Sequence, residues 1–202
     1  MVQSQAIKDD LSANAMLGVG NQYRARDASA LAVFLSDLQV NKRIDRIFKL
    51  EREHRHPNYL SSLPMTASFL TGEGHAANFL KGVATDFLSG VHPMPIVEPI
   101  QAWSYKNASL LAQTFVYAAE SYDLATCIME GFDGRRVKEI LRVPDRYAIP
   151  LMVATGYEYE DPSNVSRTPR LDLEEIVFGE TFASPLSLLD DEGAIKEKED
   201  AA

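Results

Sequence analysis

The pattern of apolar and polar positions predicts a helix-rich α+β fold. Residues 101–122 form the longest periodic segment, with a broad apolar face at helical spacing, so we expect a long central helix there. Two further apolar runs, at residues 30–38 and 149–157, are typical of buried strands. The second run is almost continuously apolar, which indicates a strand covered on both faces.

Shorter helices are expected around these elements. Residues 11–16 close an N-terminal helix that glycines then end, and residues 42–54 have amphipathic spacing. Asp133 is a favourable N-cap for a helix that continues through Arg142, and Pro144 marks its end.

The segment from residue 57 to residue 99 is less regular. Helical pieces are expected around residues 66–69 and 74–88. Residues 90–99 contain three prolines, and this segment can only be a loop or an extended connection.

Length and composition favour one globular domain. The chain has 202 residues, 46% of them hydrophobic, which is enough for one sizeable core without a second domain. We therefore expect a single domain over residues 1–188. The remaining residues, 189–202, are acidic and small, and this composition predicts a disordered tail.

Charge and hydropathy exclude several classes of partner. The net charge of -9 argues against a general nucleic-acid partner, because phosphate backbones are bound by basic surfaces. No apolar run reaches the ~18 residues that suggest a membrane span, and the first ten residues do not resemble a secretory signal. The sequence thus predicts a cytoplasmic protein with no membrane partner.

Cysteine and histidine offer little chemistry. Cys127 is the only cysteine, so neither an intrachain disulfide nor a thiolate-rich metal site can form. Its apolar surroundings favour a small buried hydrophobic residue, and the alternative, a redox-active thiol, lacks a nearby basic residue to lower its pKa. His54 and His56 have cationic neighbours and the wrong spacing for one helical face, so they indicate a solvated helix end rather than a metal site.

One motif points to a particular chemistry. Residues 126–133 read Thr-Cys-Ile-Met-Glu-Gly-Phe-Asp, and the apolar run at 149–157 follows after one short helix. This arrangement resembles the flavin-binding half of the nitroreductase family. The resemblance implies that Met129, Glu130 and Gly131 lie against the isoalloxazine ring of FMN and act through main-chain N–H groups. A glycine suits this position because, without a Cβ, the backbone can approach a flat ring closely.

Two further segments match the family in the same order along the chain. The segment 20–29 resembles the family's helix-to-strand junction, which implies that Asn21 and Arg24 contact the polar edge of the flavin. Residues 166–171 resemble the basic segment that binds the FMN phosphate, which assigns that role to Arg170 and, as a substitute, to Arg167. A planar guanidinium suits phosphate because its parallel donors meet two oxygens at once. The alternative for Arg170 is an ordinary surface arginine after a turn.

The chain also departs from the family pattern. Family members open with a helix that carries a basic, serine-containing phosphate motif, followed by a first strand, and this sequence shows neither. The expected fold is therefore a nitroreductase-like central sheet flanked by helices, without the N-terminal helix and first strand. Two interpretations stay open at this point: an incomplete version of a longer protein, or a degenerate member.

The resemblance implies an FMN-dependent oxidoreductase that uses NAD(P)H to reduce nitroaromatic or quinone-like acceptors. FMN carries the chemistry, so no side chain is assigned a catalytic role and no metal is expected. The resemblance also implies a homodimer whose pocket is built from both chains. The competing hypothesis is a non-catalytic dimerisation module that has lost tight FMN binding, because Thr168 stands where the family has a lysine.

Overall fold

A computed structural model describes residues 1–71, 75–158 and 169–185. The chain divides into two compact units, residues 1–158 and residues 159–202, and each is treated by itself. In the described part of the second unit lies a short helix, α8 (Leu173–Ile176). The acidic residues 189–202 lie outside the described residues, and both the single domain over 1–188 and its tail stay predictions.

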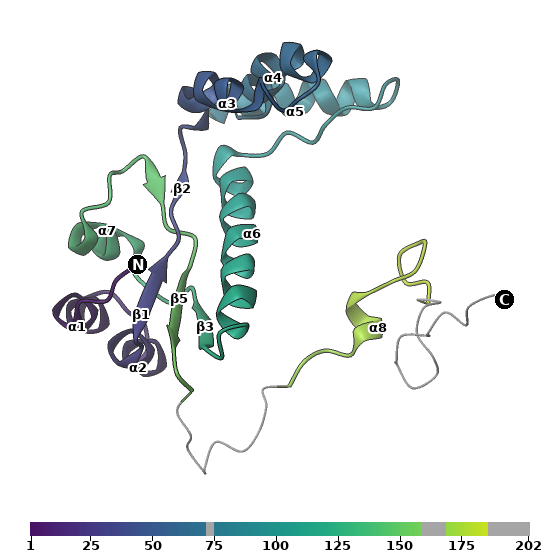
Figure 1. Ribbon diagram of the computed structural model, residues 1–202. Coiled ribbons are helices and arrows are strands. Elements are labelled where there is room, and N and C mark those ends of the chain that lie inside the picture. Colours follow the sequence, from purple (N-terminus) through teal and green to yellow (C-terminus); the bar gives the residue numbers. More distant parts are fainter. Residues whose placement is uncertain (72–74, 159–168, 186–202) are drawn as a thin grey trace. The chain divides into compact units, whose positions relative to one another are not determined.

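A three-stranded antiparallel sheet forms the centre of the first unit (Figure 1). Its strands are β1 (Ala30–Val33), β3 (Ala125–Met129) and β5 (Met152–Gly156), in the order β1-β5-β3. The apolar run at 149–157 thus becomes the middle strand. The run at 30–38 does not form one strand as predicted, because the chain leaves the sheet after Val33. It resumes as β2 (Ser36–Asp37), which pairs with β4 (Tyr147–Ala148) in a separate two-stranded ladder.

The middle strand is covered on both faces, as its sequence predicts. Met152 and Ala154 point to one side, into a cluster that includes Leu11 of the first helix. Val153, on the alternate side, packs in a second cluster with Ala112. Successive side chains of a strand point to opposite faces, so a strand between two helical layers is apolar on both faces, as at Met152, Val153 and Ala154.

The helices of the first unit follow the predicted order with shifted ends. The element before α3 is a 3-10 turn, Val40–Arg43. The α-helices are α1 (Gln5–Asn14), α2 (Val19–Asp27), α3 (Ile44–Glu51), α4 (Pro57–Leu70), α5 (His75–Ser89), α6 (Ile100–Glu120) and α7 (Gly134–Leu141).

Some helix ends differ from the predictions for local reasons. The helix expected only around residues 66–69 begins much earlier, at Pro57, because a proline at the first helical position loses no hydrogen bond. At the end of α7, Arg142 adopts a left-handed conformation with φ of 54°, which stops the helix one residue earlier than expected. No described helix is long and apolar enough to cross a membrane.

The long helix α6 packs on the sheet through small residues. Its buried positions are Ser104, Ala108, Ala112 and Ala119, spaced at helical intervals along one face. Small side chains allow the helix axis to approach the strands closely. Two of the larger apolar residues of α6, Leu110 and Tyr117, point away from the sheet and are each 70% exposed.

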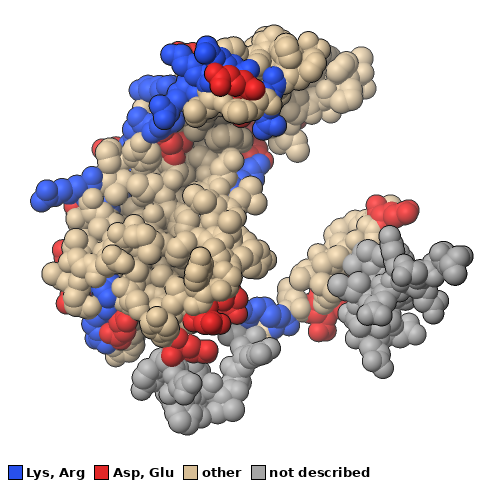
Figure 2. Space-filling model, viewed as in Figure 1, with Lys and Arg blue, Asp and Glu red and all other residues tan. Residues whose placement is uncertain are grey.

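Basic side chains gather around α3, although the chain as a whole is acidic (Figure 2). The cluster comprises Lys42, Arg43, Arg46, Lys49, Arg52 and Arg55. Arg55 pairs with Glu51 one helical turn away, and Arg43 pairs with Asp37 of β2. Part of this positive charge is therefore neutralised within the chain.

Candidate functional site

The candidate site is built around the turn that follows β3. Met129 is the last residue of that strand, is 2% exposed and pairs with Met152 in the middle strand. Glu130 and Gly131 then leave the sheet, and Glu130 is exposed. A buried strand end thus fixes the start of the turn, while the turn itself stays accessible.

The other side of the turn is fixed by the start of α7. The carboxylate of Asp133 accepts hydrogen bonds from the main-chain N–H groups of Arg135 (3.0 Å) and Arg136 (3.2 Å), which confirms the predicted N-cap. The main-chain N–H of Asp133 donates to the carbonyl of Ala15 (2.7 Å), and the Arg136 guanidinium donates to Asn14 (2.9 Å). Two contacts therefore attach the turn to the end of α1.

Asn21 joins α2 to the turn across 110 residues of sequence. Its side-chain nitrogen Nδ2 donates to the carbonyl of Leu17 at 3.0 Å and to the carbonyl of Gly131 at 3.2 Å. The main-chain N–H of Leu17 donates to the same Gly131 carbonyl at 2.9 Å. The Gly131 carbonyl is thus held by two donors from the α1–α2 segment.

The structure gives its own reason for glycine at position 131. A Cβ built on Gly131 would lie 2.2 Å from Nδ2 of Asn21, far inside any allowed contact. The φ angle of Gly131 lies outside the left-handed region, so an unusual backbone conformation is not the cause. A side chain at position 131 would displace the Asn21 amide, which occupies the space where that side chain would begin.

Arg24 lies one helical turn after Asn21 and extends the same cluster. Its Nη1 lies 3.5 Å from Oδ1 of Asn21, and it would be 3.0 Å from a Cβ on Gly20. The Arg24 side chain is exposed. The structure therefore brings together three of the residues predicted from sequence: Asn21, Arg24 and Gly131.

The turn also presents main-chain donors. Within the described residues, the N–H groups of Glu130 and Gly131 donate to no acceptor, whereas the Gly131 carbonyl is fully engaged. Adjacent N–H groups without acceptors, beside an arginine, form an electropositive site that suits a group gaining negative charge. This donor set fits the electron-accepting ring of a flavin.

Both predicted phosphate ligands belong to the second unit. Arg167 lies outside the described residues. Arg170 belongs to the second unit, where its Nη1 donates to the carbonyl of Pro169 at 3.2 Å. The structure brings Asn21, Arg24 and Gly131 together, and the flavin contacts assigned to them, like the phosphate contacts, stay predictions.

Other reactive groups do not converge on the turn. In the described part of the chain, no three His, Cys, Asp or Glu side chains are grouped to hold a metal ion. Cys127 is half-buried in β3, and its Sγ lies 3.7 Å from the carbonyl of Ile128. Its surroundings resemble those of an ordinary strand residue.

An ion-pair network that sequence reasoning missed connects β2 to β4. Asp37 accepts hydrogen bonds from Arg146 and from Nε of Arg43 (2.7 Å), and Arg43 also donates to the Tyr147 hydroxyl at 3.0 Å. Burial alone would raise the pKa of Asp37, but the two guanidinium groups outweigh it and lower the pKa to about 2. The network holds the two-stranded ladder together and is electrostatic support, not a reactive centre.

The nitroreductase family model matches residues 98–157, which extend from just before α6 to just after β5. Over 82 residues the chain is 38% identical to NADH dehydrogenase of Thermus thermophilus, covering 40% of this chain and 38% of that protein. Over 65 residues it is 38% identical to MhqN of Bacillus subtilis, named as a candidate NAD(P)H nitroreductase, covering 32% of this chain and 30% of that protein. The matched region thus spans well under half of each relative.

A solved structure extends the likeness beyond this segment. A candidate nitroreductase of Exiguobacterium sibiricum, crystallised with FMN, superposes with a TM-score of 0.63 at 13% identity. The superposition covers 87% of this chain and 72% of that chain. The predicted nitroreductase-like α+β fold is therefore confirmed, and so is the resemblance to the nitroreductase family, whose model matches residues 98–157.

Proposed function

We propose that this chain, which resembles the nitroreductase family in sequence over residues 98–157 and in fold, binds FMN and uses NAD(P)H to reduce small acceptors. The proposed acceptors are nitroaromatic or quinone-like molecules. The observation that carries this proposal is the pair of N–H groups at Glu130 and Gly131, which donate to no acceptor among the described residues. The Asn21 amide, which also contacts Arg24, holds this turn. The names of the relatives agree with it, since one is an NADH dehydrogenase and another a candidate NAD(P)H nitroreductase.

The residues of the turn have distinct proposed roles. Bound FMN would supply the hydride transfer chemistry, which no amino-acid side chain provides. The N–H groups of Glu130 and Gly131 would donate to the ring edge, and the Arg24 cation would favour a negatively charged ring. Met129, buried in the sheet, anchors the strand end from which the turn departs.

In this proposal the main role of Asn21 is to hold the turn in place, not to contact FMN. Both N–H bonds of its amide nitrogen are directed to the carbonyls of Leu17 and Gly131, which leaves Oδ1 as its remaining polar atom. Asn21 therefore positions the turn, and through Oδ1 it also lies beside Arg24. Arg167 and Arg170 complete the proposal as ligands of the FMN phosphate.

The test is a flavin titration of the purified protein. We expect a visible flavin absorbance band that stays with the protein through gel filtration. Replacing Arg24 with Gln removes a charge beside the ring and is expected to weaken FMN binding about tenfold, the scale of a charge-assisted hydrogen bond. Arg26→Gln is the matched control, because Arg26 pairs with Asp27 on the same helix and is not in the cluster.

Two further variants probe the ends of the site. Arg170→Ala is expected to weaken FMN binding by about 1–3 kcal/mol if Arg170 binds phosphate. Gly131→Val, which places a branched side chain against Asn21 and the ring, is expected to abolish flavin retention. Equal dissociation constants for wild type and Arg170→Ala would make Arg170 a surface residue. Normal flavin content in Gly131→Val would remove the basis of the whole assignment.

The alternative function is a non-catalytic dimerisation module. It is favoured by Thr168, which stands at the position of a phosphate-binding lysine in the family. Protein that remains colourless after mixing with FMN, while it folds and associates normally, would support this alternative. The same titration therefore separates the two functions.

We further propose a homodimer, in which the exposed apolar side of α6 meets a second copy. Leu110, Leu111 and Tyr117 of this helix are each more than 60% exposed, which is unusual for a helix with so many apolar residues. Leu110→Glu is expected to shift sedimentation toward monomer, because it places a charge in the apolar surface of the proposed interface. A wild-type protein that is monomeric at micromolar concentration would refute the dimer. The cytoplasmic location inferred from the sequence stays a prediction.

A further inference from the structure

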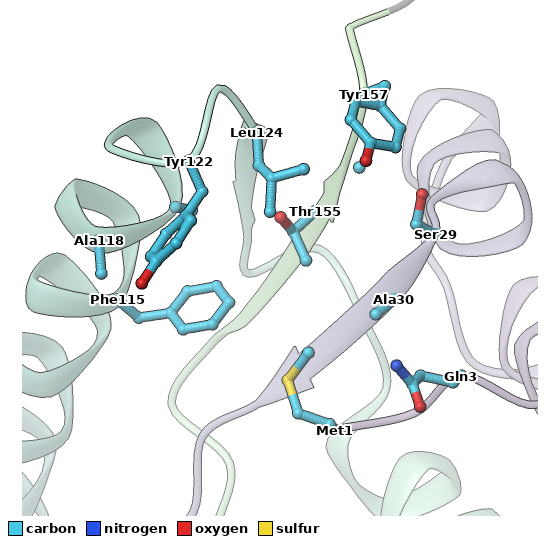
Figure 3. Close-up of a pocket in the computed structure, with 12 residues that line it drawn as sticks. Met1, Gln3, Ser29, Ala30, Phe115, Ala118, Tyr122, Leu124, Thr155 and Tyr157 are labelled. Carbon is cyan, nitrogen blue, oxygen red and sulfur yellow. The ribbon is translucent and has the colours of Figure 1, made fainter.

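A cavity of about 440 Å³ lies between the C-terminal turns of α6 and the sheet (Figure 3). It is found where β1 and β3 begin and β5 ends, whereas the Gly131 turn follows the opposite end of β3. Its volume is within the roughly 300–1,000 Å³ of small-molecule sites. The cavity is therefore large enough for a ligand and separate from the proposed flavin site.

Apolar side chains form most of the cavity wall. Phe115 and Tyr122 come from α6, Leu124 from the connection to β3, and Ala30 from β1. In Figure 3 the rings of Phe115 and Tyr122 stand on the α6 side, facing the strand that carries Thr155, and Tyr157 adds a third aromatic ring just after that strand. Aromatic rings beside aliphatic carbons favour a flat apolar ligand.

Thr155 supplies a polar atom in this wall. Its side chain is 7% exposed, and its Oγ1 is buried with no hydrogen-bond partner among the described residues. Thr155 lies on the α6 side of the middle strand, two residues after Val153, which packs in the cluster with Ala112. A buried hydroxyl without a partner is costly and uncommon, so its presence in a cavity wall points to a partner that enters the cavity.

Charge narrows the class of ligand. The side chains of the described residues that line the cavity carry no charge. Burying an ion among uncharged side chains is strongly unfavourable. The lining side chains therefore favour a neutral ligand.

We propose that this cavity binds a small neutral aromatic molecule, of one or two rings, whose hydroxyl or carbonyl group hydrogen-bonds to Oγ1 of Thr155. The aromatic rings of Phe115 and Tyr122 contact its faces, and the threonine hydroxyl fixes its orientation. This site does not depend on the proposed function, because it shares no residue with the turn at Glu130 and Gly131.

The experiment uses 2-naphthol as the probe and amide NMR spectra of the full chain as the readout. We expect saturable shifts at Gly156, Thr155 and Ala118, with no comparable shifts at Gly131. Naphthalene, which lacks the hydroxyl, should bind at least several-fold more weakly, and the anion 2-naphthoate should not bind. Absence of saturable shifts at the cavity residues, or shifts confined to the Gly131 turn, would overturn the proposal.

Substitutions of the residues that line the cavity test their proposed contacts with the ligand. Thr155→Val keeps the shape and removes the hydroxyl, so it should weaken 2-naphthol about tenfold while leaving naphthalene unchanged. Thr114→Val is the control, since Thr114 lies on the exposed side of α6 and does not line the cavity. Ala118→Phe should fill the cavity and exclude both probes. Unchanged 2-naphthol affinity in Thr155→Val would overturn the assigned hydrogen bond, even if Ala118→Phe failed to fold.

Discussion

Gly131→Ala is expected to destabilise the protein, through Asn21 rather than through the backbone. The added methyl carbon would lie 2.2 Å from Nδ2 of Asn21, so the amide must move away. The atoms next in distance are farther: Cγ of Asn21 at 3.5 Å and the carbonyl oxygen of Leu17 at 3.6 Å. The conflict is thus confined to one side chain.

The magnitude follows from the hydrogen bonds that Asn21 would lose. Its amide donates to Leu17 at 3.0 Å and to Gly131 at 3.2 Å, and a typical hydrogen bond contributes about 0.5–1.5 kcal/mol to stability. Loss of both predicts a decrease of about 1–3 kcal/mol in the free energy of unfolding. Because φ at this position is ordinary, no additional backbone strain is expected.

The assay is a double-mutant cycle measured by urea unfolding. Asn21→Ala removes the amide, and Gly131→Ala should then cost almost nothing in the Asn21→Ala background. The expected coupling energy between the two positions is therefore about 1–3 kcal/mol. Gly134→Ala is the matched control, because its Cβ would meet nothing closer than 3.9 Å, and it should be close to neutral.

Additivity of the two substitutions would refute this reasoning. If Gly131→Ala cost as much in the Asn21→Ala background as in the wild type, the glycine would be required for some reason other than the amide. The dissociation constant for FMN can be measured for the same set of variants. Under the proposed function, flavin binding should weaken in both single variants, because Asn21 positions the turn.

Two further stability predictions follow from buried polar groups. The depressed pKa of Asp37 means that its pairing contributes stability above the unfolded pKa of 3.8, and this contribution, on the order of 2 kcal/mol, is lost as pH falls toward about 2. Asp37→Asn should remove that part of the pH dependence in urea unfolding between pH 5 and pH 2, whereas Asp27→Asn, at an exposed pair, should leave it nearly intact. Thr155→Val should raise the free energy of unfolding by about 1 kcal/mol, because it removes a buried hydroxyl without a partner, and a decrease would show that Oγ1 is satisfied within the protein.

Several features were accessible from sequence because they are local. The helical periodicity at 101–122 predicts α6, and the continuous apolar run at 149–157 predicts a strand buried on both faces. Asp133 was predicted as an N-cap because the capping hydrogen bonds involve residues only two and three positions away. In each case the structure is set by residues that are close together in the sequence, so the local sequence pattern is enough to predict it.

The resemblance of sequence motifs to a known family also predicted part of the candidate site. It selected Asn21, Arg24 and Gly131, and the structure places these residues in one cluster. For the glycine it gave one reason, the close approach of a flat ring, which stays a prediction. The structure shows that the Asn21 amide fills that space, a fact that depends on how α2 docks against the turn.

The sequence alone thus predicted the longest helix, the middle strand and the fold class, and it proposed a set of site residues. Only the tertiary structure decided that the run at 30–38 divides into β1 and β2, and that α6 contacts the sheet through alanines rather than its larger apolar residues. Only the tertiary structure shows that Oγ1 of Thr155 lies beside a cavity with no hydrogen-bond partner in the described part of the chain. Periodicity records which face of an element is apolar, but contacts between distant segments depend on the shapes that meet when the elements pack.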